Sequence, residues 1–245
     1  MTFYILTLFP ESVMAMLNES ILKRAAEKEI IQIEAINIRD FSNDKHKRVD
    51  DAPYGGGNGM IMKIEPVKAA MDYLCEKCEK KPYLIYMSPC GEVFRQETAK
   101  RLRKEHDTIA ILCGHYEGID ERIIESMVDE EISIGDFVLT GGEIPAAALV
   151  DAVARLVPGV LSEEGCFQEE SHYSGLLEHP QYTRPPEFEG MRVPEVLQKG
   201  HHAMIEEYKR FSGLQRTKKR RPDMFARLTL SAEELAKLAA FEKDL

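Results

Sequence analysis

The chain has 245 residues, of which 44% are hydrophobic and 30% are charged, and its formal net charge is −10. A chain of this length and composition buries a substantial core, which excludes the fibrous and disordered classes of protein. Taken alone, the negative total also argues against a nucleic-acid partner, because phosphates bind to positive surfaces.

No apolar run approaches the roughly 20 residues that span a bilayer. The N-terminus has neither the basic start nor the small-residue cleavage site of a secretory signal, so we expect a cytoplasmic protein without a membrane segment. The five cysteines are an odd number, which indicates free thiols rather than a disulfide framework.

Strand and helix patterns alternate over residues 1–160, which we interpret as one α/β domain. The alternation predicts a mostly parallel sheet with helices on both faces. A glycine-rich irregular segment interrupts it at 39–62. The predicted strands are 3–9, 30–38, 83–87, 108–113 and 131–134, and the predicted helices are 11–28, 66–80, 96–104, 121–127 and 144–156.

The alternation stops near Val157-Pro158-Gly159. Residues 161–175 are predicted to form a linker, and residues 176–245 a small all-helical domain. Ser231 and Glu234 have the spacing of a capping box, so the last helix is expected to begin there.

Charge is distributed unevenly between these parts. Residues 176–245 contain 13 Lys and Arg against 11 Asp and Glu, a net charge of +2, which leaves −12 for the first 175 residues. The stretch 209–221 holds seven basic residues and no acid. It is either a phosphate-binding surface or a solvated helix face.

Common nucleotide and hydrolase motifs are absent: there is no P-loop, no Gly-x-Gly-x-x-Gly after a strand and no Gly-x-Ser-x-Gly. The pair Cys75 and Cys78 has no second pair at zinc-ligand spacing, so no metal site is predicted. Instead, glycine-bearing loops follow three predicted strands, at 86–91, 112–122 and 132–145. Ligands of α/β sheets bind at the carboxyl ends of strands, so these loops predict one cleft whose main-chain groups suit an adenine base.

Five segments carry a resemblance that covers nearly the whole chain. They are HKRVDDAPYGGGNGM at 46–60, GHYEGIDER at 114–122, SIGDFVLTGGE at 133–143, GLLEHPQYTRP at 175–185 and GHH at 200–202. Together they resemble the bacterial tRNA (guanine-N1)-methyltransferases, a family of the knotted (SPOUT-type) methyltransferases.

The resemblance implies a deep trefoil knot at the end of the α/β domain, with S-adenosylmethionine bound in its loops. It also implies a homodimer with the active site at the subunit interface, and methylation of N1 of the guanine immediately 3′ of the tRNA anticodon. Magnesium dependence is a further implication.

The reaction itself requires two protein groups. N1 of neutral guanine carries a proton, so a general base must remove it as the new N–C bond forms. Negative charge then develops towards O6, where a cation stabilises the transition state.

By the resemblance, the cation is Arg155 and the base occupies position 170, where the family has aspartate and this chain has Glu170. The added methylene shifts the carboxylate, and a misplacement of about 1 Å costs as much as a hundredfold in rate. Glu170 serves as base after a small linker shift, or Glu169 or Glu164 does, or the enzyme is slow.

The resemblance also assigns binding residues. RNA contact is expected from positions 46, 50, 115 and 171 and from the basic stretch. The cofactor residues are Tyr86, Ser88, Pro89, Gly114, Tyr116, Glu117, Ile134, Gly135, Asp136, Phe137, Val138, Leu139, Gly141, Gly142 and Pro145. The RNA residues are His46, Asp50, His115, Ser171, Lys209, Arg210, Arg216, Lys218, Lys219 and Arg220.

Two other classes remain open from the sequence. One is a related knotted methyltransferase with a different RNA target. The other is a non-catalytic RNA-binding relative that has lost its general base. This class stays open because position 170 holds glutamate where the family has aspartate.

Overall fold

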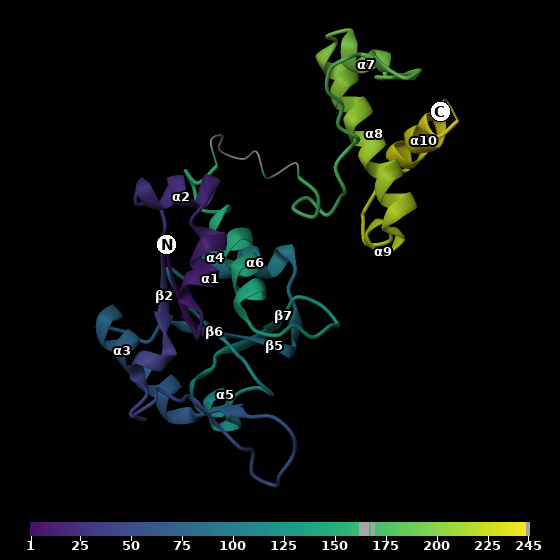
Figure 1. Ribbon diagram of the computed structural model, residues 1–245. Helices are drawn as coiled ribbons and strands as arrows, with labels where there is room; N and C mark the ends of the chain where they lie inside the picture. Colours follow the sequence, from purple (N-terminus) through teal and green to yellow (C-terminus); the bar gives the residue numbers. More distant parts are fainter. Residues whose placement is uncertain (162–166, 168–169, 244–245) are drawn as a thin grey trace. The chain divides into compact units, whose positions relative to one another are not determined.

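The computed structural model describes residues 1–161, 167 and 170–243. Its contacts divide the chain into two compact units, Met1–Glu164 and Gly165–Leu245, whose elements are shown in Figure 1. Among the described residues, every helix is too short or too polar to span a bilayer. The expected domain limits at residues 160 and 175 stay a prediction.

The N-terminal unit is built on a five-stranded sheet in the order β2-β1-β6-β5-β7. All four neighbouring pairs are parallel, which confirms the predicted α/β class. Its strands are β1 (Thr2–Thr7), β2 (Gln32–Asn37), β5 (Tyr83–Val93), β6 (Thr108–Cys113) and β7 (Glu130–Ser133).

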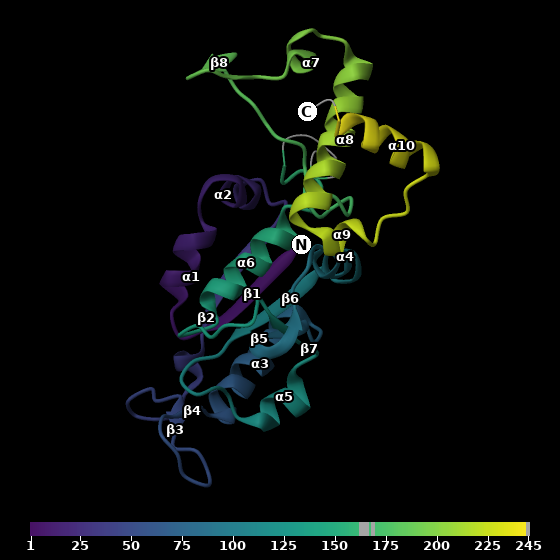
Figure 2. The ribbon, with the colours of Figure 1, turned by 90° about the vertical axis from the view of Figure 1, so that its right-hand side faces the viewer.

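Helices cover both faces of this sheet (Figure 2). On one face, α6 packs against α1 and α4, and on the other α3 contacts α5. Side chains alternate along each strand, so Tyr4 and Leu112 join the core under α3, while the buried Ile5 and Ile111 face the opposite side. The helices are α1 (Pro10–Leu17), α2 (Ser20–Glu27), α3 (Ile64–Cys78), α4 (Gln96–Glu105), α5 (Glu121–Met127) and α6 (Glu143–Ala154).

Two of the predicted elements needed correction. The helix expected at 11–28 is two helices, because Glu19 is extended and Ser20 has a φ of +51°, which a right-handed helix does not accommodate. The strand expected to end at residue 87 continues to Val93, with a shift of register between Met87 and Glu92. Pro89 and Gly91, from the loop expected at 86–91, lie within this irregular part of the strand.

The segment 39–62 is more regular than expected. It begins within the short 3₁₀ helix η1 (Ile38–Phe41) and contains the antiparallel pair β3 (Asp50–Asp51) and β4 (Ile61–Met62). Met62 also pairs in parallel with Ile119, so the segment is joined to the chain that follows β6.

The C-terminal unit is helical with one exception. Its helices are α7 (Glu195–Gln198), α8 (His202–Arg220), α9 (Pro222–Phe225) and α10 (Ala232–Phe241). The expectation of an all-helical domain is wrong in one respect: β8 (Glu187–Phe188) and β9 (Met191–Arg192) form a hairpin. Glu189 and Gly190 in its turn both have positive φ, the backbone that a tight hairpin needs.

The core of the C-terminal unit lies between α8 and α10. Leu176, Phe211, Leu214 and Leu238 form its buried cluster. The predicted capping box is confirmed: the Ser231 hydroxyl accepts a hydrogen bond from the Glu234 backbone N–H, and the Glu234 carboxylate accepts one from Ser231.

Candidate active site

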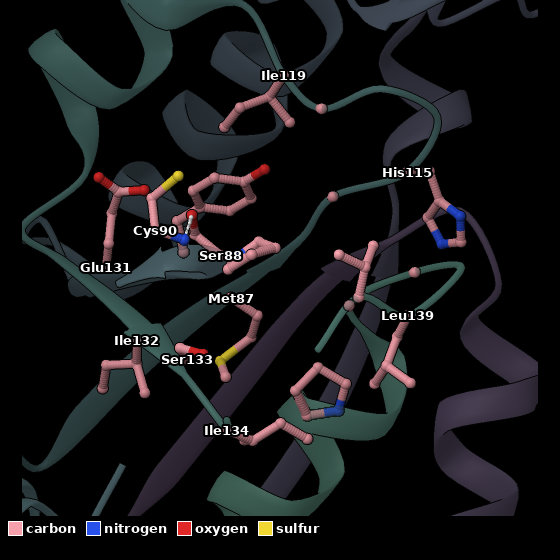
Figure 3. Close-up of a pocket in the computed structure, with 18 of the residues that line it drawn as sticks. Met87, Ser88, Cys90, His115, Ile119, Glu131, Ile132, Ser133, Ile134 and Leu139 are labelled. Atoms are coloured by element: carbon pink, nitrogen blue, oxygen red, sulfur yellow. Dashed lines mark hydrogen bonds between the residues drawn. The ribbon is translucent and has the colours of Figure 1, made fainter. Parts of the chain in front are cut away.

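A cavity of about 450 Å³ lies beside the register shift of β5 and the carboxyl ends of β6 and β7, within the size range of small-molecule sites. Three chain segments surround it, and Figure 3 shows Ser88, Ile119 and Ile134 as examples of their side chains. The lining comprises residues 86–90, 114–119, 121, 124, 131–135, 137–142 and 145. The predicted cleft at the strand ends is therefore present in the fold.

The residues that the resemblance assigns to the cofactor lie together around this cavity. Every one of them lines it except Asp136, which is exposed. Their role in cofactor binding stays a prediction. The fold nevertheless brings residues as far apart in the sequence as Tyr86 and Pro145, 59 positions, to one cavity.

The wall formed by β5 is polar and neutral. Ser88 is buried, and its hydroxyl accepts a hydrogen bond of 3.1 Å from the Cys90 N–H. Burial, with a smaller contribution from the charge of Glu131, raises the pKa of Tyr86 to about 12. The Tyr86 hydroxyl is therefore a neutral group at physiological pH.

The loop after β6 is held from two sides. On one side, the Gly142 N–H donates to the Gly114 carbonyl at 3.0 Å, and His115 pairs with Gly141. On the other, the Glu117 N–H donates to Met60 at 3.0 Å. These main-chain bonds bring the segments 114–118 and 141–142 side by side.

A buried carboxylate lies beside these two segments. Glu143, the first residue of α6, is 7% exposed. The His115 Nε2 lies 2.8 Å from each Glu143 oxygen, and the Thr7 hydroxyl donates to one of them. Burial opposes ionisation of this carboxyl, but the hydrogen bonds from His115 and Thr7 outweigh burial and hold the pKa of Glu143 below its ordinary value.

The sequence did not identify Glu143 or Thr7 as site residues. Glu143 ends one of the quoted motifs, but its partner Thr7 is 136 positions away, and no local pattern links the two. His115, predicted to contact RNA, lines the cavity with its ring turned to Glu143 and its side chain 13% exposed.

The two predicted catalytic residues belong to different units. Arg155 caps the C-terminus of α6, and its N–H donates to Asp151 at 3.1 Å. Glu170 belongs to the C-terminal unit, where its carbonyl accepts the N–H of Tyr173 at 3.3 Å. The alternative bases Glu164 and Glu169 lie outside the described residues.

The remaining predicted RNA residues lie outside the cavity. His46 is exposed, and Asp50 is half-buried in β3. The Ser171 hydroxyl accepts the N–H of Glu178 at 3.0 Å and donates to the Glu178 carboxylate at 3.3 Å.

The basic stretch 209–221 lies mainly on α8, and several of its cations are paired. Lys209, Arg210 and Lys218 form ion pairs with Glu206, Glu234 and Glu242, respectively. Arg216 is half-buried; Lys219 and Arg220 are exposed and have no ion pair with any described residue. Exposed pairs are worth about 0–1 kcal/mol each, so a phosphate can displace them.

The fold and the cavity define a class: an α/β protein with a parallel sheet and a cavity of small-molecule size beside the strand ends. A family model described as tRNA (Guanine-1)-methyltransferase TrmD matches residues 1–227. A protein of Ruminiclostridium cellulolyticum named tRNA (guanine-N(1)-)-methyltransferase is 58% identical over 228 residues, covering 93% of this chain and 97% of that protein. One of the same name from Clostridioides difficile is 51% identical over 226 residues, covering 92% and 97%.

A solved structure agrees with these relatives. The crystal structure of the tRNA (m1G37) methyltransferase from Aquifex aeolicus is 42% identical, covers 91% of this chain and 93% of its own, and has a TM-score of 0.74. The chain therefore belongs to the tRNA (guanine-1)-methyltransferase family. This confirms the resemblance and the expected methyltransferase class, and with them the use of S-adenosylmethionine.

Replacing Gly142 by alanine tests whether cofactor binding requires the close approach of the segments 114–118 and 141–142. Its φ of −83° suits any residue, but a Cβ there would lie 2.6 Å from the Cys113 Cα and 3.0 Å from the Gly114 N. We expect the Kd for S-adenosylmethionine, measured by isothermal titration calorimetry, to rise at least about tenfold, since overpacking costs about 1–3 kcal/mol.

Gly56→Ala is the matched control. Its φ of +78° disfavours alanine, but no atom lies within 4 Å of a Cβ at that position. This variant should lose some stability and keep the wild-type Kd. A wild-type Kd in Gly142→Ala would show that this close approach does not shape the cofactor site.

Proposed function

We propose that this chain transfers the methyl group of S-adenosylmethionine to N1 of the guanine immediately 3′ of the anticodon, position 37, of tRNA. The observation that carries the proposal is the cavity beside the register shift of β5 and the carboxyl ends of β6 and β7, which nearly all the residues assigned to the cofactor by resemblance line. The position of the target guanine follows the name of the solved relative, a tRNA (m1G37) methyltransferase.

The cavity fits S-adenosylmethionine in size and in chemistry. Main-chain groups of residues 88–90, 114–118 and 132–142 offer the donors and acceptors that an adenine base needs, and Ile134 and Leu139 offer apolar surface. The carboxylates of Glu117 and Glu131 line the same cavity and suit a cationic ligand. When bound, the sulfonium supplies an electrophilic methyl group.

The remaining chemistry falls to two side chains. Glu170 takes the N1 proton of the guanine as the new N–C bond forms, and the Arg155 guanidinium stabilises the charge that develops on O6. A carboxylate at position 170 preserves the base that the family aspartate provides, with one more methylene to position. Magnesium dependence stays a prediction: no cluster of three or more His, Cys, Asp or Glu suited to a metal occurs in the described residues, and we assign no step to an ion.

We further propose a homodimer whose active site combines the cavity of one protomer with Arg155 and Glu170 of the other. Large apolar side chains are exposed at the rim of the cavity: Phe137 is 54%, Val138 81% and Ile144 56% exposed. Such a patch is typical of an interaction surface. The return of residues 141–142 to the chain after β6 supports the implied trefoil knot in this region.

For RNA binding, we propose the C-terminal unit. Lys219 and Arg220 are exposed, and the ion pairs of Lys209, Arg210 and Lys218 are open to exchange with phosphates. Binding through such a surface weakens as salt rises. A tRNA substrate also agrees with the cytoplasmic location that we expect.

Two unmodified tRNA transcripts test the reaction and its target together. They differ only in carrying guanine or adenine immediately 3′ of the anticodon, and methyl transfer from labelled S-adenosylmethionine is counted. Because guanine N1 accepts the methyl group, we expect label in the first transcript alone. Label in neither contradicts the enzyme proposal and favours a non-catalytic RNA-binding protein, whereas label in both contradicts the proposed position.

Variants at position 170 test the base. Glu170→Ala removes the carboxylate, so single-turnover methyl transfer should fall by about a hundredfold or more, the range of general-base catalysis. Glu170→Asp restores the family side chain and should keep or raise the rate. Wild-type rates in Glu170→Ala would move the role to another residue, with Glu164→Ala and Glu169→Ala as the comparisons.

Mixing two inactive variants tests the shared site. Gly142→Ala is expected to bind the cofactor at least about tenfold more weakly, so the mixture is assayed at a cofactor concentration that fills only wild-type cavities. Glu170→Ala lacks the base, so a mixed dimer retains one intact site. If the subunits exchange at random, activity should recover to about a quarter of the wild-type value, because half of the dimers are mixed and each has one working site. No recovery, with exchange verified by mass spectrometry, would contradict a site shared between protomers.

A further inference from the structure

Glu143 stands apart from the residues that line the cavity. Among the residues that the structure describes, it is the one charged residue that is buried, with 7% of its surface exposed. Neither Glu143 nor its partner Thr7 lines the cavity. Whatever Glu143 does for the cofactor site, it does through other groups.

Burial of a carboxylate is costly unless donors compensate for it, and Glu143 has three sources of compensation. The Thr7 hydroxyl donates to it from the end of β1. The His115 Nε2, 2.8 Å from both oxygens, comes from the loop after β6. Glu143 also begins α6, where the helix dipole favours negative charge.

Besides His115, Cys113 is a titratable group near this carboxylate. Burial, followed by the charge of Glu143, raises the pKa of the Cys113 thiol. Cys113 therefore stays neutral and does not compete for the donors of Glu143. The ionised carboxylate is left to bind Thr7 and His115.

His115 transmits this arrangement to the cavity wall. Its ring is packed against Phe9 at a centroid distance of 4.9 Å, and its backbone pairs with Gly141. A Cβ at Gly141 would lie 2.2 Å from the His115 Cε1 and 2.7 Å from a Glu143 oxygen. The turn at Gly141 therefore packs directly on the His115–Glu143 pair, and Figure 3 shows His115 at the edge of the cavity.

We propose that Glu143 is a positioning residue of the cofactor site: its carboxylate joins Thr7 and His115 and so holds the segments 114–118 and 141–142 in the geometry that binds S-adenosylmethionine. The inference rests on the proposed function and goes beyond it, since Glu143 is not among the residues that line the cavity. If the loops were free to move, only a fraction of the molecules would be competent to bind, and the apparent Kd would rise by the inverse of that fraction. The rate with cofactor at saturation would change little, because no reacting group is lost.

The chain offers a conservative pair of variants at Thr7, which is fully buried. Thr7→Val keeps the shape and removes the hydroxyl, whereas Thr7→Ser keeps the hydroxyl that donates to Glu143 and accepts the Phe9 N–H at 2.9 Å. Glu143→Gln removes the negative charge that accepts the hydrogen bond from Thr7. Glu97→Gln is the control, because Glu97 is an exposed glutamate in the first turn of α4.

Three quantities are measured for each full-length variant: the Kd for S-adenosylmethionine by calorimetry, the kcat at saturating cofactor and tRNA, and the thermal midpoint without ligand. Thr7→Val and Glu143→Gln should raise Kd about tenfold, the usual loss when a hydrogen bond to a buried charge is removed. Their kcat should stay within about twofold of the wild type. Thr7→Ser and Glu97→Gln should match the wild type in both quantities.

A wild-type Kd in folded Thr7→Val and Glu143→Gln would overturn the proposal, even with a lowered thermal midpoint, because it would reduce the network to a structural role. A kcat that falls while Kd is constant would overturn it as well. Should Glu143→Gln fail to fold, the comparison of Thr7→Val with Thr7→Ser tests the proposal by itself. Failure of the proposed function is distinguishable, since the wild-type protein would then bind no S-adenosylmethionine or transfer no methyl group.

Discussion

One buried carboxylate ties together the chain segments on which the cofactor cavity is built. The surroundings of Glu143 are complete only after three segments have met: the end of β1, the loop after β6 and the start of α6. Without Thr7 and His115, an ionised group at this depth would cost several kcal/mol. Folding of the N-terminal unit therefore brings the loops 114–118 and 141–142 together before any ligand is present, so the main-chain groups that face the cavity need little further ordering on binding.

The residues proposed for cofactor binding and those proposed for catalysis occupy different parts of the architecture. The cavity lies at one edge of the parallel sheet, beside the register shift of β5 and the ends of β6 and β7. Arg155 lies at the far end of α6 from Glu143, and Glu170 belongs to the second unit. Charge follows a similar division, because the net −10 combines a strongly acidic first part with a tail that has a small positive excess. The acidic total is thus compatible with an RNA substrate.

Regular elements with a strong local pattern were predicted well. The strand at 108–113 and the helix at 121–127 have the expected bounds, since each is a compact apolar run or an amphipathic turn bounded by polar residues. The errors occur where a backbone turn interrupts an expected helix, or where a strand continues past its expected last residue through a bulge. Ser20 breaks a helix through a positive φ, and Pro89 lies in a bulge rather than after a strand. In both cases packing against neighbouring elements decides the outcome, and sequence periodicity carries no information about those neighbours.

The amino-acid sequence by itself determined the α/β class, the loops that form the cavity and the family, because strand periodicity and glycine-rich motifs are local and each is readable within about a dozen residues. Only the tertiary structure decided that Thr7, His115 and Glu143 form one buried network. Their contacts join residues as many as 136 positions apart, and such pairs depend on the order in which the strands lie in the sheet. It also decided that the His115 side chain, read from the motif as a contact for RNA, is turned to a carboxylate. A buried charge selects its partners by distance in space, and a linear motif records only neighbours along the chain.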